Sequence, residues 1–458
     1  MTPTTLRLYV VLTIANSPLL LFGNSGSLPA APNPVLKRTG AQVDGGLSCT
    51  ACHQSFAPTN SDNRGRVVIE SAYYKPGQKQ TIRVRVEHPE AQRWGFQLTA
   101  RTASDETKTA GSFTPSASVR VECDDGSPRG SLPPCAEGTL QFASHTAEST
   151  RNGTSGGVWW DVEWMPPATG AGDVVFYASG NAANGNGTSA GDRIYTTALR
   201  VGGCSAAVKP SIRAVVNAAT YQPGIALNTI VSIFGEGFAR AGQMRAAGTG
   251  DFDRGNFPKE LACMAVEING QRAPVVYVQG DQINAQVPTI PVSGPVQVRV
   301  LANPGAPNQM ASDPVTIQMH NHAPALFTFG SSKSVAAIVP GTGQPIANPN
   351  VIQEGRPARP GEIVELYGTG FGVTEPVYQA GERPPEGARI RDPFTVAIGG
   401  TTLRAEDVLY GGIAPTSISG LFQFNVRLPE SLADGDVPVV IRIGGLESQS
   451  GVMVPVKR

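Results

Sequence analysis

Glycine and proline interrupt this chain at short intervals, and this feature limits its possible folds most strongly. The 53 glycines and 38 prolines make up about a fifth of the 458 residues, against a usual combined share of about 12%. Both residues disfavour the interior of a helix, so the chain cannot consist mainly of long helices. Between the interruptions, apolar and polar residues alternate with the period of a half-buried strand, as in QTIRVRVEH at 80–88. This pattern favours many short strands joined by turns.

The first 30 residues have the order of a secretory signal peptide. A short segment with Arg7 as its charge precedes the mostly apolar stretch LYVVLTIANSPLLLF at 8–22, and small residues follow. This order predicts export and cleavage, with an uncleaved anchor as the alternative. The apolar stretch is shorter than the ~20 residues that a membrane span needs. We therefore expect a mature chain without a transmembrane span, either secreted, periplasmic or at the cell surface, where disulfides persist.

The charge balance argues against a nucleic-acid partner. Lys+Arg and Asp+Glu both number 36, so the formal net charge is zero, whereas domains that bind nucleic acid are basic. Charged residues make up 16% of the chain and hydrophobic residues 40%, which is the opposite of the balance in disordered proteins. The composition therefore indicates folded domains.

Strand-like segments fill two regions of different character. Region 61–203 contains a series of them separated by turn-rich gaps, which predicts an antiparallel sandwich. Region 204–458 contains an internal repeat, in which NTIVSIFGEGFA at 228–239 matches GEIVELYGTGFG at 361–372. The shared Gly-X-Gly-Phe segment lacks the full G-x-G-x-x-G spacing of a phosphate loop, so it is interpreted as a structural turn.

These regions divide the chain into five parts and predict an all-β protein. Each of the three largest parts is long enough to bury its own core, so we expect three antiparallel β-sandwiches in tandem. The parts are the signal peptide at 1–30, a cysteine-containing segment at 31–60, the first sandwich at 61–203 and the two repeats at 204–319 and 320–458.

Two stretches resemble known families. GLSCTACHQS at 46–55, RWGFQLTA at 93–100 and the long GDVVFYASGNAANGNGTSAGDRIYTT segment resemble the bacterial Reeler (reelin-like) domain of secreted choice-of-anchor proteins, over about 45–203. VVNAATYQPGIALNTIVSIFGEGFA and LFQFNVRLPESLADGDVPVVI resemble the C-terminal module of acidobacterial secreted proteins, over about 211–458. The repeats themselves are similar to IPT/TIG units, which have an immunoglobulin-like fold. Both resemblances imply sandwich folds and an extracellular setting, and neither implies an enzymatic activity.

The motif with the sharpest chemistry is Cys49-Thr50-Ala51-Cys52-His53, which has the C-x-x-C-H pattern of c-type haem attachment. Two thiols three positions apart can form thioethers with the vinyl groups, and the adjacent His53 can bind the iron as proximal ligand. Export agrees with this interpretation, because c-type haem is attached outside the cytoplasm. The flanking segment, however, is short and rich in glycine, so a Cys49–Cys52 disulfide or another metal site is the alternative.

A second axial ligand for the iron would come from His or Met, the usual donors. The Reeler resemblance includes His145, and we predict this residue as the distal ligand; the alternative is a hydrogen-bonded residue at a strand end. His88 precedes Pro89 at a strand end, so we expect it at the surface. Met165 precedes a proline and is expected in the core.

The other four cysteines admit three pairings. Cys123 and Cys135 flank the turn-rich segment DDGSPRGSLPP, and a disulfide between them would stabilise the fold by ~3 kcal/mol in the chain-entropy model. Cys204 lies at a domain boundary and Cys263 in the first repeat. We expect these two to pair, with two free thiols as the alternative.

Three weaker signals have simple structural interpretations. GTSGG at 153–157 and GTSAG at 187–191 match G-x-S-x-G, but each precedes a strand-like stretch, whereas a nucleophile elbow leads into a helix. NAANGNGTSAGD offers oxygen ligands for calcium, yet Asp192 is its only carboxylate, so turn chemistry is expected instead. In VWWDVEW, alternation places Trp160 in the core and Trp159 on the opposite face, where it could contact a partner.

These observations predict a secreted or cell-surface, non-enzymatic binding or adhesion protein with a covalent haem c. The haem would be held by Cys49, Cys52, His53 and His145, and the partner would be an extracellular protein or carbohydrate. The alternative is a mono-haem electron-transfer or redox-sensing protein, in which the sandwiches are scaffold and a redox partner exists.

Overall fold

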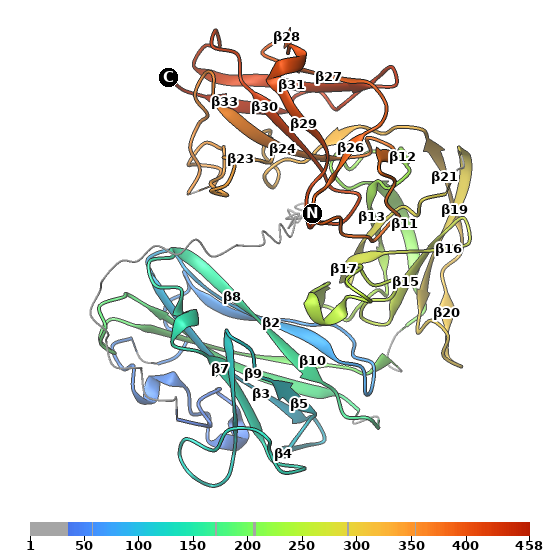
Figure 1. Cartoon of the computed structure of the whole chain (residues 1–458). Helices are drawn as coiled ribbons and strands as arrows, with labels where there is room; N and C mark the ends of the chain where they lie inside the picture. The colour runs from blue at the N-terminus through green and yellow to red at the C-terminus, as the bar shows by residue number, and fades with distance from the viewer. Residues whose placement is uncertain (1–34, 57, 170–171, 205–207, 291–292, 353) are drawn as a thin grey trace, which may run out of the picture.

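The structure, a computed structural model, describes residues 35–458 except 57, 170–171, 205–207, 291–292 and 353. Its strands form six sheets, and the sheets pair into three sandwiches that follow one another along the chain (Figure 1). The predicted all-β sandwich architecture is confirmed. In the part of the chain that the structure describes, no helix has the length and apolar character needed to span a bilayer. The predicted signal peptide at 1–30 lies outside the described residues.

The first sandwich has a core of aromatic side chains. Trp160 and Trp164 project inward from one sheet and Trp94 from the other, and each is at most 1% exposed. Because successive residues of a strand face opposite sides, Trp159 lies on the outer face and is 52% exposed. One sheet has the order β1 (Arg66–Glu70), β2 (Gln80–His88), β8 (Gly156–Met165), β5 (Ser112–Thr114). The other has the order β10 (Arg193–Val201), β9 (Val174–Ala183), β3 (Arg93–Thr102), β7 (Gln141–His145), β6 (Val119–Cys123), with β4 (Asp105–Thr109) beside β3.

The segment before β1 is attached to the sheet that contains β3. The Arg38 amide donates a hydrogen bond to Oε1 of Gln97 over 2.7 Å. Nη2 of Arg101 lies 2.6 Å from Oδ2 of Asp44, and both side chains of this ion pair are buried. The segment is therefore fixed to the sandwich by side chains of β3. It contains the short 3-10 turns η1 (Gln42–Asp44) and η2 (Cys49–Ala51).

The second sandwich spans residues 211–320. Its core contains fully buried aliphatic side chains from both sheets, including Ile233, Val266 and Val298. One sheet has the order β11 (Ser211–Asn217), β13 (Ile230–Glu236), β18 (Gln282–Gln286), β17 (Val275–Gln279), β14 (Met244–Ala246). The other has the order β12 (Ile225–Ala226), β21 (Val315–His320), β19 (Gly294–Ala302), β15 (Met264–Ile268), β16 (Gln271–Ala273), with β20 (Met310–Ala311) beside β19.

The third sandwich follows with the same general arrangement. Its core includes the fully buried Leu366, Phe424 and Ile441. One sheet has the order β22 (Ala325–Leu326), β24 (Ile363–Thr369), β30 (Phe422–Arg427), β29 (Val408–Ile413), β26 (Ala388–Ile390), β25 (Thr374–Glu375), with β23 (Ala337–Ile338) beside β24. The other has the order β28 (Thr401–Thr402), β27 (Phe394–Ile398), β31 (Gly435–Ile443), β32 (Leu446–Glu447), with β33 (Met453–Val456) beside β31. Further 3-10 turns are η3 (Glu148–Thr150), η5 (Thr249–Asp251) and η6 (Ala405–Asp407).

The repeated Gly-X-Gly-Phe segment has the same structural role in both copies. A Cβ atom on Gly235 would lie 1.9 Å from the carbonyl oxygen of Ser211, and one on Gly368 would lie 2.4 Å from that of Ala325. Only glycine allows a neighbouring backbone to approach so closely. The phenylalanine that ends each segment is fully buried. In each repeat, the first glycine thus allows a close contact between strands, and the phenylalanine packs in the core.

A disulfide joins the first two sandwiches. Cys204, just after β10, is bonded to Cys263, just before β15, and the two are 59 residues apart in sequence. Tyr73, between β1 and β2, is 2% exposed and belongs to the core of the second sandwich. This connection is therefore both covalent and apolar.

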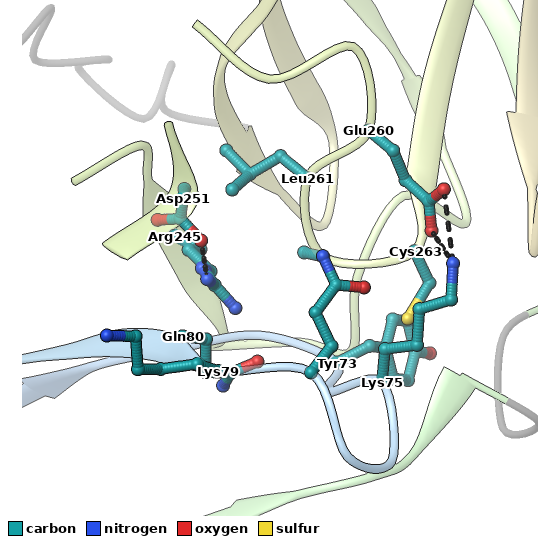
Figure 2. Close-up of a pocket in the computed structure, with 11 residues that line it drawn as sticks. Tyr73, Lys75, Lys79, Gln80, Arg245, Asp251, Glu260, Leu261 and Cys263 are labelled. Carbon is teal, nitrogen blue, oxygen red and sulfur yellow. Dashed lines mark hydrogen bonds and ion pairs between the residues drawn. The ribbon is translucent and has the colours of Figure 1, made fainter. Parts of the chain in front are cut away.

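A small cavity lies beside this joint, and Figure 2 shows the side chains that line it. Lys75 faces Glu260 across the joint, with Nζ and Oε1 separated by 3.2 Å, and Arg245 forms a buried ion pair with Asp251. The cavity has a volume of about 20 Å³, enough for a single water molecule. Its charged side chains all have ion-pair partners, Lys79 with Glu163 outside the cavity and the others with each other. We therefore assign the cavity to the joint and not to ligand binding.

Candidate functional site

A larger cleft lies between the N-terminal segment and the sheet that contains β3 and β9. Its volume is about 420 Å³, within the range of about 300–1,000 Å³ that is typical of small-molecule sites. Apolar residues and three arginines contribute to its wall, although the side chains of Trp94 and Phe96 are buried in the core of the sandwich. The apolar residues are Val35, Ala51, Trp94, Phe96 and Ala183, and the arginines are Arg38, Arg93 and Arg129.

All four residues predicted to hold a haem line this one cleft. Cys49, Cys52 and His53 reach it from the N-terminal segment, and His145 reaches it from the end of β7. The sequence separates His145 from the motif by the whole of β1 to β6. The fold therefore brings together side chains whose proximity the sequence could only suggest.

The two cysteines lie on a compact turn. η2 begins at Cys49, and the side chain of Ser48 accepts a hydrogen bond from the Thr50 amide over 3.3 Å. The amide of His53 donates to the carbonyl oxygen of Cys49 over 3.0 Å, which continues the turn. Both cysteines are free thiols, with Cys52 exposed and the pKa of Cys49 raised by burial. Neither thiol is consumed by a disulfide in the described structure.

His53 is held by a buried carboxylate. Its Nδ1 atom lies 2.7 Å from Oδ2 of Asp192, whose side chain is 2% exposed. Asp192 lies immediately before β10, at the end of the NAANGNGTSAGD segment. A carboxylate can only accept a hydrogen bond, so Nδ1 of His53 carries a proton.

His145 is the last residue of β7, and its imidazole ring contacts the backbone of β3. Its Nδ1 atom lies 3.0 Å from the amide nitrogen and 3.2 Å from the carbonyl oxygen of Phe96. Burial lowers the pKa of His145, with smaller contributions from Arg93 and His53, which favours the neutral imidazole. A proton on Nδ1, donated to the carbonyl oxygen of Phe96, would leave Nε2 available as a ligand. A Cβ atom on Gly95 would lie 2.6 Å from Cε1 of this ring. Glycine at this position is therefore what makes room for His145.

The cleft also has unpaired positive charge. Nε of Arg38 is buried and has no hydrogen-bond partner. Arg93 also lines the cleft, and no ion pair links either guanidinium to a carboxylate among the described residues. Both arginines are half-buried, and Nη1 of Arg38 donates to the carbonyl oxygen of Lys37 over 3.2 Å. Because neither guanidinium has a carboxylate partner, this wall of the cleft is suited to an anionic ligand.

The two other residues considered as axial ligands do not line the cleft, and their expected environments were wrong. His88 is 1% exposed and its Nε2 lies 3.2 Å from Oδ2 of Asp62. His88 faces inward, like the alternate apolar residues of β2 before it. The proline that follows His88 had suggested a surface position. Met165 is 37% exposed, because it follows the inward-facing Trp164 and so faces outward.

The other weak signals have structural roles. The two G-x-S-x-G segments lead into β8 and β10, so neither has the helix that a nucleophile elbow requires. The side chain of Asn186 accepts hydrogen bonds from Thr188 within its own turn. No group of three or more His, Cys, Asp or Glu side chains suited to a metal ion occurs among the described residues. Cys123 and Cys135 form a disulfide with a Cα–Cα distance of 5.4 Å.

Comparison with known proteins places this sandwich in a family. Residues 48–182 match the Reeler domain. The resemblance inferred from the sequence is thereby confirmed for this region, and the matched residues include the cysteine motif and His145. A comparison with curated proteins gives no match.

Several solved structures are similar at low identity. A structure of the human F-spondin reeler domain is 18% identical, covers 31% of this chain and 92% of its own, and has a TM-score of 0.20. A second fragment of that domain is 17% identical, with coverages of 34% and 99% and a TM-score of 0.22. The Bacteroides ovatus protein SGBP-B, solved with a mixed-linkage heptasaccharide, is 10% identical, with coverages of 88% and 68% and a TM-score of 0.22.

Sequence reasoning missed three contributors to the cleft. Asp192 was considered only as a calcium ligand, although it is the partner of His53. Gly95 and the unpaired Arg38 were not singled out. The glycine in RWGFQLTA, at a position where a strand would favour a larger residue, is the signal that could have indicated a close approach.

Proposed function

We propose that this protein is an extracellular, non-enzymatic binding protein whose Reeler domain carries a covalent haem c in the 420 Å³ cleft. Cys49 and Cys52 would form the thioethers, and His53 and His145 would be the axial ligands. A haem held in this way supplies one-electron redox chemistry. The observation that carries the proposal is that these four side chains, from two distant parts of the chain, line the same cleft.

The chemistry of the cleft supports a haem. Both thiols are free. The motif contributes one histidine to the cleft, His53, and β7 contributes the other, His145. Val35 and Ala51 offer apolar surface to a macrocycle, and Arg38 and Arg93 offer partners for its carboxylates. The two disulfides and the Reeler domain support an extracellular location.

Co-expression with a haem-maturation system is expected to give an exported protein that stains for haem on a denaturing gel and has a Soret band. The double variant Cys49→Ala/Cys52→Ala should lose the stain completely, because no thioether can form. His145→Ala should keep the stain and shift the absorption spectrum, because one axial ligand is lost.

The matched control is Cys123→Ser/Cys135→Ser, which removes two cysteines distant in sequence from the motif and should leave the haem stain unchanged. A colourless band from correctly exported wild-type protein would refute the haem proposal. Equal staining of the Cys49→Ala/Cys52→Ala variant would refute covalent attachment.

For the binding role, we propose that the exposed part of the outer face of β8, around Trp159, contacts a carbohydrate. Trp159 is 52% exposed, and the guanidinium of Arg83 lies 5.5 Å from its ring centroid. Arg83 also pairs with Asp161 on the same face. A half-exposed indole beside polar groups combines stacking surface with hydrogen bonds. The two C-terminal repeats, which we propose are IPT/TIG-like, would extend the protein from this surface.

Trp159→Ala is expected to reduce binding of the haem-free protein on a glycan array by at least about tenfold, a typical loss for an interface tryptophan. Leu446→Ala removes another exposed apolar residue, on the third sandwich, and should not change the array signal. Equal losses in both variants, or none in Trp159→Ala, would contradict this assignment.

A further inference from the structure

The partners of Asp192 suggest a role beyond packing. Its Oδ2 atom lies 2.7 Å from Nδ1 of His53, and its Oδ1 atom accepts from the amide of Asn184 over 3.3 Å. Among the described residues, its only ion-pair partner is His53. A buried carboxylate needs paired charge or several hydrogen bonds. Asp192 also accepts a longer hydrogen bond from Nδ2 of Asn181, over 3.5 Å, so its shortest contact and its charge partner are the imidazole of His53.

A competing hydrogen bond is weaker. Nδ2 of Asn181 lies 3.4 Å from Nδ1 of His53, so an amide could in principle donate to an unprotonated Nδ1. The contact to Asp192 is 0.7 Å shorter, from 3.4 to 2.7 Å, and hydrogen bonds to an ionised group are the stronger ones. His53 is therefore held in the tautomer with the proton on Nδ1.

We infer that Asp192 is a positioning residue that fixes this tautomer of His53 and makes its Nε2 a stronger electron donor to the iron. A carboxylate behind a ligating histidine orients the ring and raises its basicity. A more basic ligand favours the oxidised metal, so Asp192 sets a low reduction potential. This inference rests on the proposed haem attachment, which its test separates from it.

The haem-loaded protein gives the first readout. Asp192→Asn should keep the haem stain and raise the reduction midpoint by at least 59 mV, which corresponds to a tenfold change for a one-electron couple. Asp192→Glu retains the charge and should return the midpoint towards that of wild type. The matched control is Asp392→Asn, which removes the partner of His322, 3.0 Å away in the third sandwich, and should leave the midpoint unchanged.

An unchanged midpoint in a haem-stained Asp192→Asn protein would overturn the inference and leave the haem proposal intact.

A second readout needs no haem. Nitrogen-15 NMR of the haem-free wild-type protein should show His53 protonated on Nδ1, with the tautomer lost or mixed in Asp192→Asn. Protonation of His53 on Nε2 in the wild type would overturn the inference independently of any staining result.

Discussion

Replacement of Cys204 and Cys263 by serine is expected to lower the free energy of unfolding by about 4 kcal/mol, because the bond closes a loop of 59 residues whose freedom then increases in the unfolded chain. The same change should let the first two sandwiches move relative to each other. Guanidinium unfolding measures the first effect. Small-angle scattering measures the second as an increase in the radius of gyration.

The other disulfide is the matched control for this prediction. Cys123 and Cys135 are 12 residues apart within the first sandwich, so Cys123→Ser/Cys135→Ser should cost about 3 kcal/mol and leave the radius of gyration unchanged. The joint retains Tyr73 and the Arg240–Asp173 ion pair without the disulfide. An unchanged radius after loss of the Cys204–Cys263 bond would show that these contacts alone fix the two sandwiches.

The second large effect concerns the ion pair between Asp44 and Arg101. Asp44→Ala is expected to destabilise the protein by about 3 kcal/mol, because it leaves the fully buried Arg101 without its carboxylate. Arg101 retains a hydrogen bond to the carbonyl oxygen of Glu106, which places the loss at the lower end of the usual range. Urea unfolding measures this loss, and faster alkylation of Cys49 should report release of the N-terminal segment.

Two further variants test whether the stability loss of Asp44→Ala comes from the unpaired charge of Arg101. The double variant Asp44→Ala/Arg101→Met should recover most of the stability, because an apolar side chain can replace a buried ion pair at little cost. Asp124→Ala removes the more exposed ion pair with Lys37 and should cost less than about 1 kcal/mol. Slow alkylation of Cys49 in Asp44→Ala would mean that other contacts hold the segment.

Local patterns predicted much of this fold. Alternation of apolar residues placed Trp160 inside and Trp159 outside, as the structure has them, because a strand has a fixed period of two. The Gly-X-Gly-Phe segment was interpreted as a structural turn, but its first glycine, Gly235 or Gly368, lies inside a strand, and only the second glycine, just after that strand, has a positive φ. His88 was misplaced because the proline after it marks the end of a strand but not the direction of the last side chain.

The cleft was only partly predictable. The spacing of Cys49, Cys52 and His53 is a local signal, so the sequence alone indicated its chemistry. The contact between His53 and Asp192 joins residues 139 positions apart, and no periodicity reports such a distance. The docking of the N-terminal segment through Asp44 depends on one buried arginine in β3, which the sequence presents as an ordinary strand residue.

The order of the cleft residues along the chain has a consequence for biogenesis. During export the thiols of the motif would emerge well before β7 and β10 supply His145 and Asp192. On our proposal, the enzymes that attach haem would act on an extended, accessible peptide. The rest of the domain would then fold around the covalently bound haem. Maturation would then be a single pass from the leading end, with the prosthetic group serving as a template for the domain that encloses it.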